Sequence, residues 1–197
     1  MRRFSFRTLI PSVLALGLMA CNAYRLDPPA GFAEVEQGYD GAHMKANNDV
    51  GLRVHVRHNV RGGTLAFWSL DLVEKLGERG YTLVNQVPLR SKNRVAGTRF
   101  DFEYTPVGEG EQPRFYTVSL FVTDEHRVVM GMAGKQQYAA EYLARVDEII
   151  GDLTVRGCKP FSKICKGPQP AGLSTTPQPD ANAKPATAEA KAEPAAG

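Results

Sequence analysis

The chain has 197 residues, 43% of them hydrophobic, with 24 Lys and Arg against 21 Asp and Glu and a formal net charge of +3. Three of the positive residues, Arg2, Arg3 and Arg7, stand at the amino terminus, and without them 21 positive residues face 21 negative ones. A neutral mature chain lacks the basic field typical of nucleic-acid-binding proteins, so we expect no nucleic-acid partner.

The first 20 residues have the layout of a secretory signal peptide, in which a positively charged start is followed by an apolar segment. The apolar segment, residues 9–19, is interrupted by Pro11 and Gly17. It is shorter than the roughly 20 residues that a transmembrane helix needs, so cleavage is favoured over a permanent membrane span.

The sequence LMAC at residues 18–21 resembles the bacterial lipobox. That resemblance implies cleavage before Cys21 and attachment of acyl chains, palmitate among them, to this cysteine. The alternative is an ordinary signal peptide with an incidental cysteine. Several acyl chains anchor a protein stably, whereas one chain attaches it only reversibly. Because Asn22 rather than Asp follows the cysteine, we expect the outer membrane, with the protein facing the periplasm.

Composition divides the mature chain into three parts. Residues 21–30 are expected to form a tether and residues 31–166 a single domain of ordinary size. Residues 167–197 consist almost entirely of Pro, Ala, Gln, Thr, Lys and Glu, and Leu173 is their one large apolar residue. Such a segment cannot bury enough apolar surface to offset its loss of entropy, so we expect a disordered tail.

Hydrophobic periodicity predicts the elements of the domain in chain order. Leu52, Val54 and Val56 alternate with charged residues, as in a half-buried strand. Thr64 is a candidate helix cap, and Gly80 a candidate helix stop. The full order is a strand at 51–58, a helix at 64–80, strands at 81–89, 98–105, 114–123 and 126–134, and a helix at 138–153.

Strands joined by short turns pair antiparallel, and two amphipathic helices need a sheet to cover. We therefore predict an α+β fold with an antiparallel sheet of about five to six strands and two main α-helices. In the strand at 98–105, Phe100 and Phe102 are expected inside, with Asp101 and Glu103 outside. The apolar character of both faces of residues 115–122 favours one helix on each face of the sheet.

The order of several motifs resembles the PsbP-like fold. They are a GF start at residue 31, GL-x-V-x-V from residue 51, a helix with Trp68 running into GY-x-L, F-x-F-x-Y, Y-x-V-x-L-F-V and a closing helix with paired tyrosines. The group includes Mog-type Ran-binding proteins, photosystem PsbP proteins and DcrB-like bacterial lipoproteins. The resemblance covers about residues 31–155 and implies a binding or assembly accessory, and no ligand residue of the group maps onto this chain.

Two cysteines remain after Cys21, at positions 158 and 165. In an exported protein such a pair favours a disulfide, Cys158–Cys165. The alternative is half of a metal site, but no second Cys or His pair lies nearby to complete four ligands. His55 and His58 are three residues apart on a strand and so point to opposite faces. We expect no metal and no cofactor.

Positive side chains gather in two sequence regions that would form a basic patch for lipid headgroups, glycan or an acidic protein if the fold brought them together. The alternative is a solvated charged face, which the neutral mature charge favours. The candidate patch consists of Arg53, Arg57, Arg90, Lys92 and Arg94.

No phosphate-binding glycine loop, nucleophile elbow or zinc-protease motif is present in the sequence. We therefore predict a lipid-anchored bacterial envelope lipoprotein that acts without enzymatic activity, as a binding or assembly accessory with an envelope protein as its partner. The alternative is an envelope hydrolase or a small-ligand carrier with a pocket between the sheet and the helices.

Overall fold

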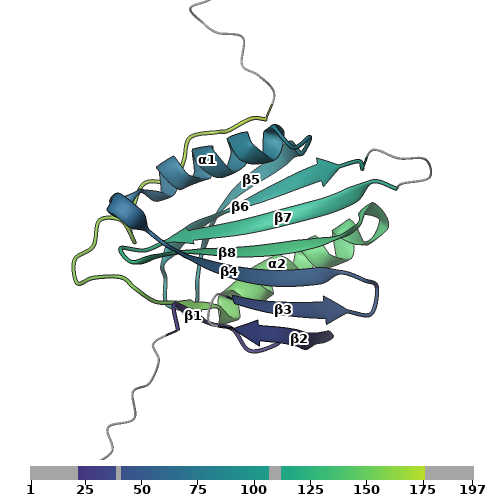
Figure 1. Ribbon diagram of the computed structural model, residues 1–197, viewed down its shortest axis with the longest axis horizontal. Coiled ribbons are helices and arrows are strands. Elements are labelled where there is room, and N and C mark those ends of the chain that lie inside the picture. Colours follow the sequence, from purple (N-terminus) through teal and green to yellow (C-terminus); the bar gives the residue numbers. More distant parts are fainter. Residues whose placement is uncertain (1–21, 39–40, 107–111, 176–197) are drawn as a thin grey trace, which may run out of the picture.

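The computed structural model describes residues 22–38, 41–106 and 112–175 (Figure 1). The predicted signal peptide, 1–20, and the predicted lipidation site, Cys21, lie outside these residues. The described elements are β1 (Tyr24–Arg25), β2 (Phe32–Gly38), β3 (Gly41–Ala46), β4 (Gly51–His58), the 3₁₀-helix η1 (Val60–Gly62), α1 (Leu65–Gly77), β5 (Thr82–Arg90), β6 (Ala96–Tyr104), β7 (Arg114–Val122), β8 (His126–Lys135), the 3₁₀-helix η2 (Gln136–Tyr138), α2 (Ala139–Asp152) and β9 (Thr154–Val155).

The main sheet has seven antiparallel strands in the order β2-β3-β4-β8-β7-β6-β5, and β1 pairs with β9 in a separate two-stranded sheet. The predicted α+β class and the two main helices are confirmed, but the predicted count of five to six strands is too low. The sequence pattern missed β2 and β3 because most side chains of β2 are exposed and β3 is rich in small residues. Neither strand therefore shows a strong alternation.

The two helices cover opposite faces of the main sheet (Figure 1), as the apolar character of both sides of β7 predicts. The core under α1 includes Leu65, Val73, Leu76, Phe100, Phe102, Val118 and Leu120. The core under α2 includes Leu52, Val54, Met130, Met132, Tyr142, Val146 and Ile149. Among the described residues, neither helix is long and apolar enough to span a bilayer.

Helix α1 begins and ends where the sequence predicts. The Thr64 hydroxyl accepts a hydrogen bond from the Phe67 N–H at 3.2 Å, which caps the first turn. At the other end Gly80 adopts φ +83°, and the N–H of Tyr81 bonds back to the carbonyl of Leu76 at 3.0 Å. This Schellman turn needs a residue that tolerates a left-handed backbone, and it turns the chain so that Tyr81 lies beside the sheet.

A charged cluster is buried beneath α2. Arg99 and Asp101 are only 9% and 5% exposed, and Arg99 Nε lies 3.2 Å from Asp101 Oδ1. Arg99 Nη1 also donates to Asp147 of α2 at 2.9 Å. Asp101 accepts hydrogen bonds from Thr117 at 2.6 Å and Asn85 at 3.1 Å. The prediction that Asp101 faces solvent is therefore wrong, because α2 covers the sheet face that carries it.

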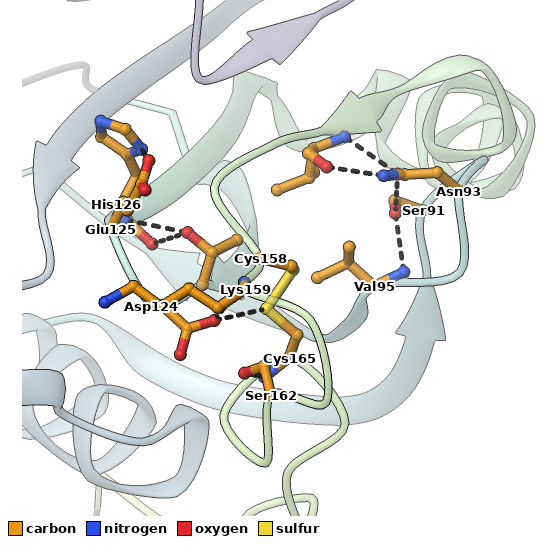
Figure 2. The surroundings of a disulfide bond; sticks show 12 residues. Ser91, Asn93, Val95, Asp124, Glu125, His126, Cys158, Lys159, Ser162 and Cys165 are labelled. Atoms are coloured by element: carbon orange, nitrogen blue, oxygen red, sulfur yellow. Dashed lines mark hydrogen bonds and ion pairs between the residues drawn. A yellow bond between two sulfur atoms is a disulfide. The ribbon is translucent and has the colours of Figure 1, made fainter.

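The predicted Cys158–Cys165 disulfide is confirmed, and it closes a loop that follows β9 (Figure 2). This loop contacts the turn between β7 and β8, where Asp124 accepts a hydrogen bond from the Lys159 N–H at 2.9 Å. The carbonyl of Cys165 also accepts from the N–H of Ala96 at 3.2 Å, at the start of β6. The disulfide thus holds the loop against the end of the main sheet.

We expect the double variant Cys158→Ser/Cys165→Ser to lower the free energy of unfolding by about 2.5 kcal/mol, because the unfolded chain gains the entropy of the open loop. Urea denaturation followed by circular dichroism measures this change. The unchanged protein under reducing conditions is the control and should lose a similar amount. Equal denaturation midpoints for the oxidised protein and the double variant would contradict the prediction.

The folded part extends beyond the predicted domain boundary of 31 at the amino-terminal side. Ala23, Tyr24 and Leu26 are each less than a tenth exposed, and β1 pairs with β9. The carbonyl of Ala23 also accepts a hydrogen bond from the Arg156 N–H at 2.7 Å. The segment that we expected to be a free tether therefore packs against the domain from the second residue after Cys21.

Residues 167–175, which we expected to begin a disordered tail, lie along β5 (Figure 1). The N–H of Leu83 donates to the Thr175 hydroxyl at 2.9 Å. The side-chain oxygen of Gln86 accepts from the N–H of Leu173 at 3.0 Å, and Leu173 packs on the core beneath α1. The backbone N–H of Leu83 and the side chain of Gln86 thus hold a segment whose composition contains little apolar surface.

Candidate functional site: an aromatic and basic hollow on the sheet

Small residues form the floor of a hollow on the sheet face that carries α1. Gly51 of β4 pairs with Ala133 of β8, and the next residue pair on the same face is Arg53 with Gly131. Three of these four positions have no side chain beyond Cβ. A hollow of about 520 Å³ lies above them, within the size range of small-molecule sites.

Three tyrosines form one wall of this hollow. The Tyr81 and Tyr104 rings are stacked, with centroids 4.5 Å apart, and the Tyr116 ring lies 5.4 Å from that of Tyr81. The Schellman turn after α1 places Tyr81, while β6 and β7 supply the other two. Tyrosines combine a flat apolar face with a polar hydroxyl, and such a wall suits a planar group or a sugar ring.

Positive and titratable side chains form the opposite wall and one end. Arg53 and His55 follow each other on the exposed face of β4, and Arg114 begins β7. Partial burial, together with the charges of Arg53 and Arg57, lowers the pKa of His55 below its ordinary value. This shift favours the neutral imidazole at pH 7, so Arg53 and Arg114 carry the positive charge of the hollow. We call this site the tyrosine–arginine hollow.

The position of the Tyr116 side chain requires a glycine at position 131. A Cβ atom on Gly131 would lie 3.1 Å from the Tyr116 hydroxyl and 3.2 Å from its ring, so the tyrosine occupies the space that this glycine leaves. Burial and the neighbouring Tyr81 raise the pKa of the Tyr116 phenol, and the charges of Arg79 and Arg53 oppose that rise. The phenol stays protonated at neutral pH and can donate a hydrogen bond to an anion.

A second, smaller hollow of about 190 Å³ lies farther along the same face, between α1 and β8. Its central contact is Arg127, whose guanidinium carbon lies 3.7 Å from the centre of the Trp68 ring. The Trp68 indole N–H donates to Asn59 at 2.9 Å. Arg57 and Arg79 also line this hollow, so positive charge continues beyond the tyrosine–arginine hollow.

The predicted basic patch does not form one surface. Arg53 and Arg57 lie on β4, whereas Arg90 ends β5, and β8, β7 and β6 separate these strands. Four strand spacings amount to about 19 Å. Lys92 and Arg94 lie in the turn after β5, where Lys92 forms an ion pair with Asp152 at 3.6 Å. The fold instead places Arg53 with Arg114 in the tyrosine–arginine hollow and Arg57 with Arg79 and Arg127 in the second hollow.

The four histidines are distributed over the sheet. His55 lies in the tyrosine–arginine hollow, and His43 lies beside it, next to Arg53 on the neighbouring strand. His58 and His126 pair across β4 and β8, with ring centroids 5.3 Å apart. Within the described ranges, no three His, Cys, Asp or Glu side chains gather as a metal site.

The described lining of the tyrosine–arginine hollow is rich in groups that can bind an anion. It contains guanidinium, imidazole and phenol groups but no carboxylate, serine or cysteine. Two arginines and a phenol donor can hold a phosphate or a carboxylate, since charge-assisted hydrogen bonds to guanidinium are among the strongest in proteins. The arrangement therefore fits an anionic group next to a flat or sugar-like ring.

Sequence reasoning missed most of this site. Periodicity favours a core position for the tyrosines, with a pocket lining as the alternative, and it does not single out Arg114. A signal existed in β8, where Gly131 and Ala133 alternate with the buried Met130 and Met132. One face of that strand is therefore apolar and large while the other is small. Such a pattern in a central strand indicates that the face with small residues lies beneath a hollow.

Comparisons with known proteins bear on the fold. The sequence matches no known protein family and no curated protein. Its structure is similar to that of LpqN, involved in cell envelope biogenesis of Mycobacterium tuberculosis, with a TM-score of 0.52 and 7% identity over 67% of this chain and 82% of LpqN. At this identity the likeness shows a shared fold.

A second similar structure is the cyanobacterial PsbP of Synechocystis sp. PCC 6803. The TM-score is 0.45, with 13% identity over 68% of this chain and 88% of that protein.

Proposed function

We propose that this protein is a lipid-anchored accessory of the bacterial cell envelope that binds a small anionic ligand without catalysing a reaction. The tyrosine–arginine hollow carries this proposal, because it combines a floor of small residues, a tyrosine wall and two arginines. The anchor at Cys21, the periplasmic face of the outer membrane and an envelope protein as a further partner belong to the same proposal.

Two further observations support an envelope role. The disulfide is typical of proteins that fold in an oxidising compartment outside the cytoplasm. LpqN, which shares the fold, is involved in cell envelope biogenesis. The described lining contains no carboxylate, serine or cysteine, and its two arginines favour binding of an anion over hydrolysis.

The ligand class follows from the groups that face the hollow. Arg53 and Arg114 can hold a phosphate or carboxylate by charge-assisted hydrogen bonds. The stacked Tyr81 and Tyr104 rings offer a flat apolar surface for an attached ring. A phosphorylated sugar has both features.

We expect Arg53→Gln to weaken binding of glucose 1-phosphate about tenfold, the loss expected for one charge-assisted hydrogen bond in a binding site. Isothermal titration calorimetry of the unchanged chain and the variant measures the dissociation constants. Glucose has only the sugar ring and inorganic phosphate only the anionic group, so each should bind more weakly than the sugar phosphate.

Arg25→Gln is the matched control, because Arg25 is an exposed arginine of β1 that forms an ion pair with Asp27, on a sheet separate from the hollow. It should leave the dissociation constant unchanged. Gly131→Val should abolish binding while the protein stays folded by circular dichroism, since the added atoms displace the Tyr116 ring. Binding that survives both Arg53→Gln and Gly131→Val would place the ligand elsewhere. If none of the three probes binds the unchanged chain, a small sugar phosphate is not its ligand.

A further inference from the structure

The disulfide loop exposes a large aromatic side chain. Phe161 is 96% exposed, whereas the other exposed large apolar residues of the described chain are 54–67% exposed. Its backbone adopts φ +61°, the left-handed region that bulky residues rarely occupy. The disulfide between Cys158 and Cys165 closes this loop, so the fold holds an aromatic ring in water in an unfavourable backbone conformation. Such a feature indicates a contact that the free domain does not make.

The residues around Phe161 are positively charged. Lys159, Lys163 and Lys166 are all exposed and lie within five residues of it. Asp124 is an acidic side chain that contacts this loop and accepts the hydrogen bond from the Lys159 N–H, and Glu125 lies next to Gly157 just before it. This combination suits the surface of a bilayer, where the aromatic ring can insert at the headgroup level and the lysines can face anionic lipid phosphates.

The loop emerges close to the point where the described chain begins. The carbonyl of Ala23 accepts from the N–H of Arg156, and Phe161 follows Arg156 by five residues. Five residues span at most about 18 Å. Only Asn22 separates Ala23 from Cys21. Figure 1 shows the loop after β9 leaving the domain at the end of the molecule where β1 lies.

We propose that the loop between Cys158 and Cys165 docks onto a bilayer with anionic lipids, with the Phe161 ring inserted at the headgroup level and the three lysines facing lipid phosphates. The placement of the loop beside a membrane rests on the proposed lipid anchor at Cys21. The docking itself rests on the exposed ring, the lysines and the rigid closure of the loop. Anchor and loop together orient the domain, because two attachment points fix a direction that a single one leaves free.

The test introduces a fluorescent reporter at the loop tip. The full chain carrying Phe161→Trp is reconstituted with phosphatidylglycerol–phosphatidylcholine vesicles whose acyl chains are brominated, and the emission of the unchanged chain is subtracted to remove the contribution of Trp68. We expect the emission of the introduced tryptophan to fall at least twofold relative to vesicles without bromine. Val84→Trp, at an exposed apolar residue of β5, is the matched control and should show no quenching.

Vesicle flotation separates this proposal from the anchor. If the chain floats with vesicles but the tryptophan at position 161 is not quenched, the docking loop is refuted and the anchor stands. If Cys21→Ser still floats and that tryptophan is quenched, the loop binds the bilayer without the anchor and the docking proposal stands. If Cys21→Ser no longer floats while the unchanged chain does, the anchor stands. A chain that does not float in either form refutes both. Quenching should also fall at least threefold in pure phosphatidylcholine, and equal quenching there would refute the role of the lysines.

Discussion

Replacing Arg99 with methionine is expected to lower the free energy of unfolding by about 3–5 kcal/mol, the cost of removing one partner of a buried ion pair. Asp101, 5% exposed, would then keep only its hydrogen bonds from Thr117 and Asn85. Methionine fills a volume close to that of the arginine stem, so the loss reports the uncompensated carboxylate rather than a cavity. Chemical denaturation followed by circular dichroism measures it.

Lys92→Met is the matched control, because Lys92 forms a solvent-exposed ion pair with Asp152 at 3.6 Å. Exposed pairs contribute about 0–1 kcal/mol, so this variant should stay within that range. The double variant Arg99→Met/Asp101→Leu should recover part of the loss, since it also removes the unpaired charge. If Arg99→Met and Lys92→Met lowered the free energy of unfolding equally, the buried cluster would contribute no more to stability than an exposed ion pair.

The second large effect is expected at Asn59, which joins three parts of the fold. Its side chain, in a residue that is 6% exposed, donates to the carbonyls of Thr123 at 2.7 Å and Gly63 at 3.0 Å, and accepts from the Trp68 indole at 2.9 Å. Asn59→Ala removes all three bonds and should lower the free energy of unfolding by about 3 kcal/mol, at about 1 kcal/mol for each.

Trp68 provides an independent readout of this change. It is the one tryptophan of the chain, and Arg127 lies over its ring. Loss of the indole hydrogen bond should shift its emission maximum in the folded state as well as lower the unfolding midpoint. Asn47→Ala, at an exposed asparagine between β3 and β4, should change neither. An unchanged midpoint for Asn59→Ala would contradict the role of this side chain as a link.

The fold was predictable wherever burial produces periodicity. Strand β4 and helix α1 each bury one face, and their bounds follow from Leu52, Val54 and Val56 and from the cap and stop of α1. Strand β2 was not predictable, because it lies at a sheet edge with only Phe32 buried. Asp101 was misplaced because an alternating strand does not reveal that a distant helix covers its polar face.

The candidate site was less predictable than the fold, since strands far apart in sequence assemble it. Arg53 was identified as part of a charged face, but its neighbours in space, Gly131 and Tyr116, are fixed by the pairing of β4 with β8 and of β8 with β7. Tyrosine in a strand has the same sequence signature in a core as in a wall. The disulfide, by contrast, was predictable, because two cysteines remain besides Cys21 and the expected signal peptide indicates an oxidising compartment.

The segment 167–175 has a consequence for association between molecules. Strand β5 is the last strand of the main sheet, and an open edge of this kind pairs readily with strands of other molecules. The bonds from Leu83 and Gln86 to this segment occupy that edge, and Pro88 removes one of its donors. At the opposite edge, exposed glutamates and a bulge in β2 oppose pairing with strands of other molecules. Cutting the chain at residue 166, where composition alone places the end of the domain, would therefore open one edge of the sheet to aggregation.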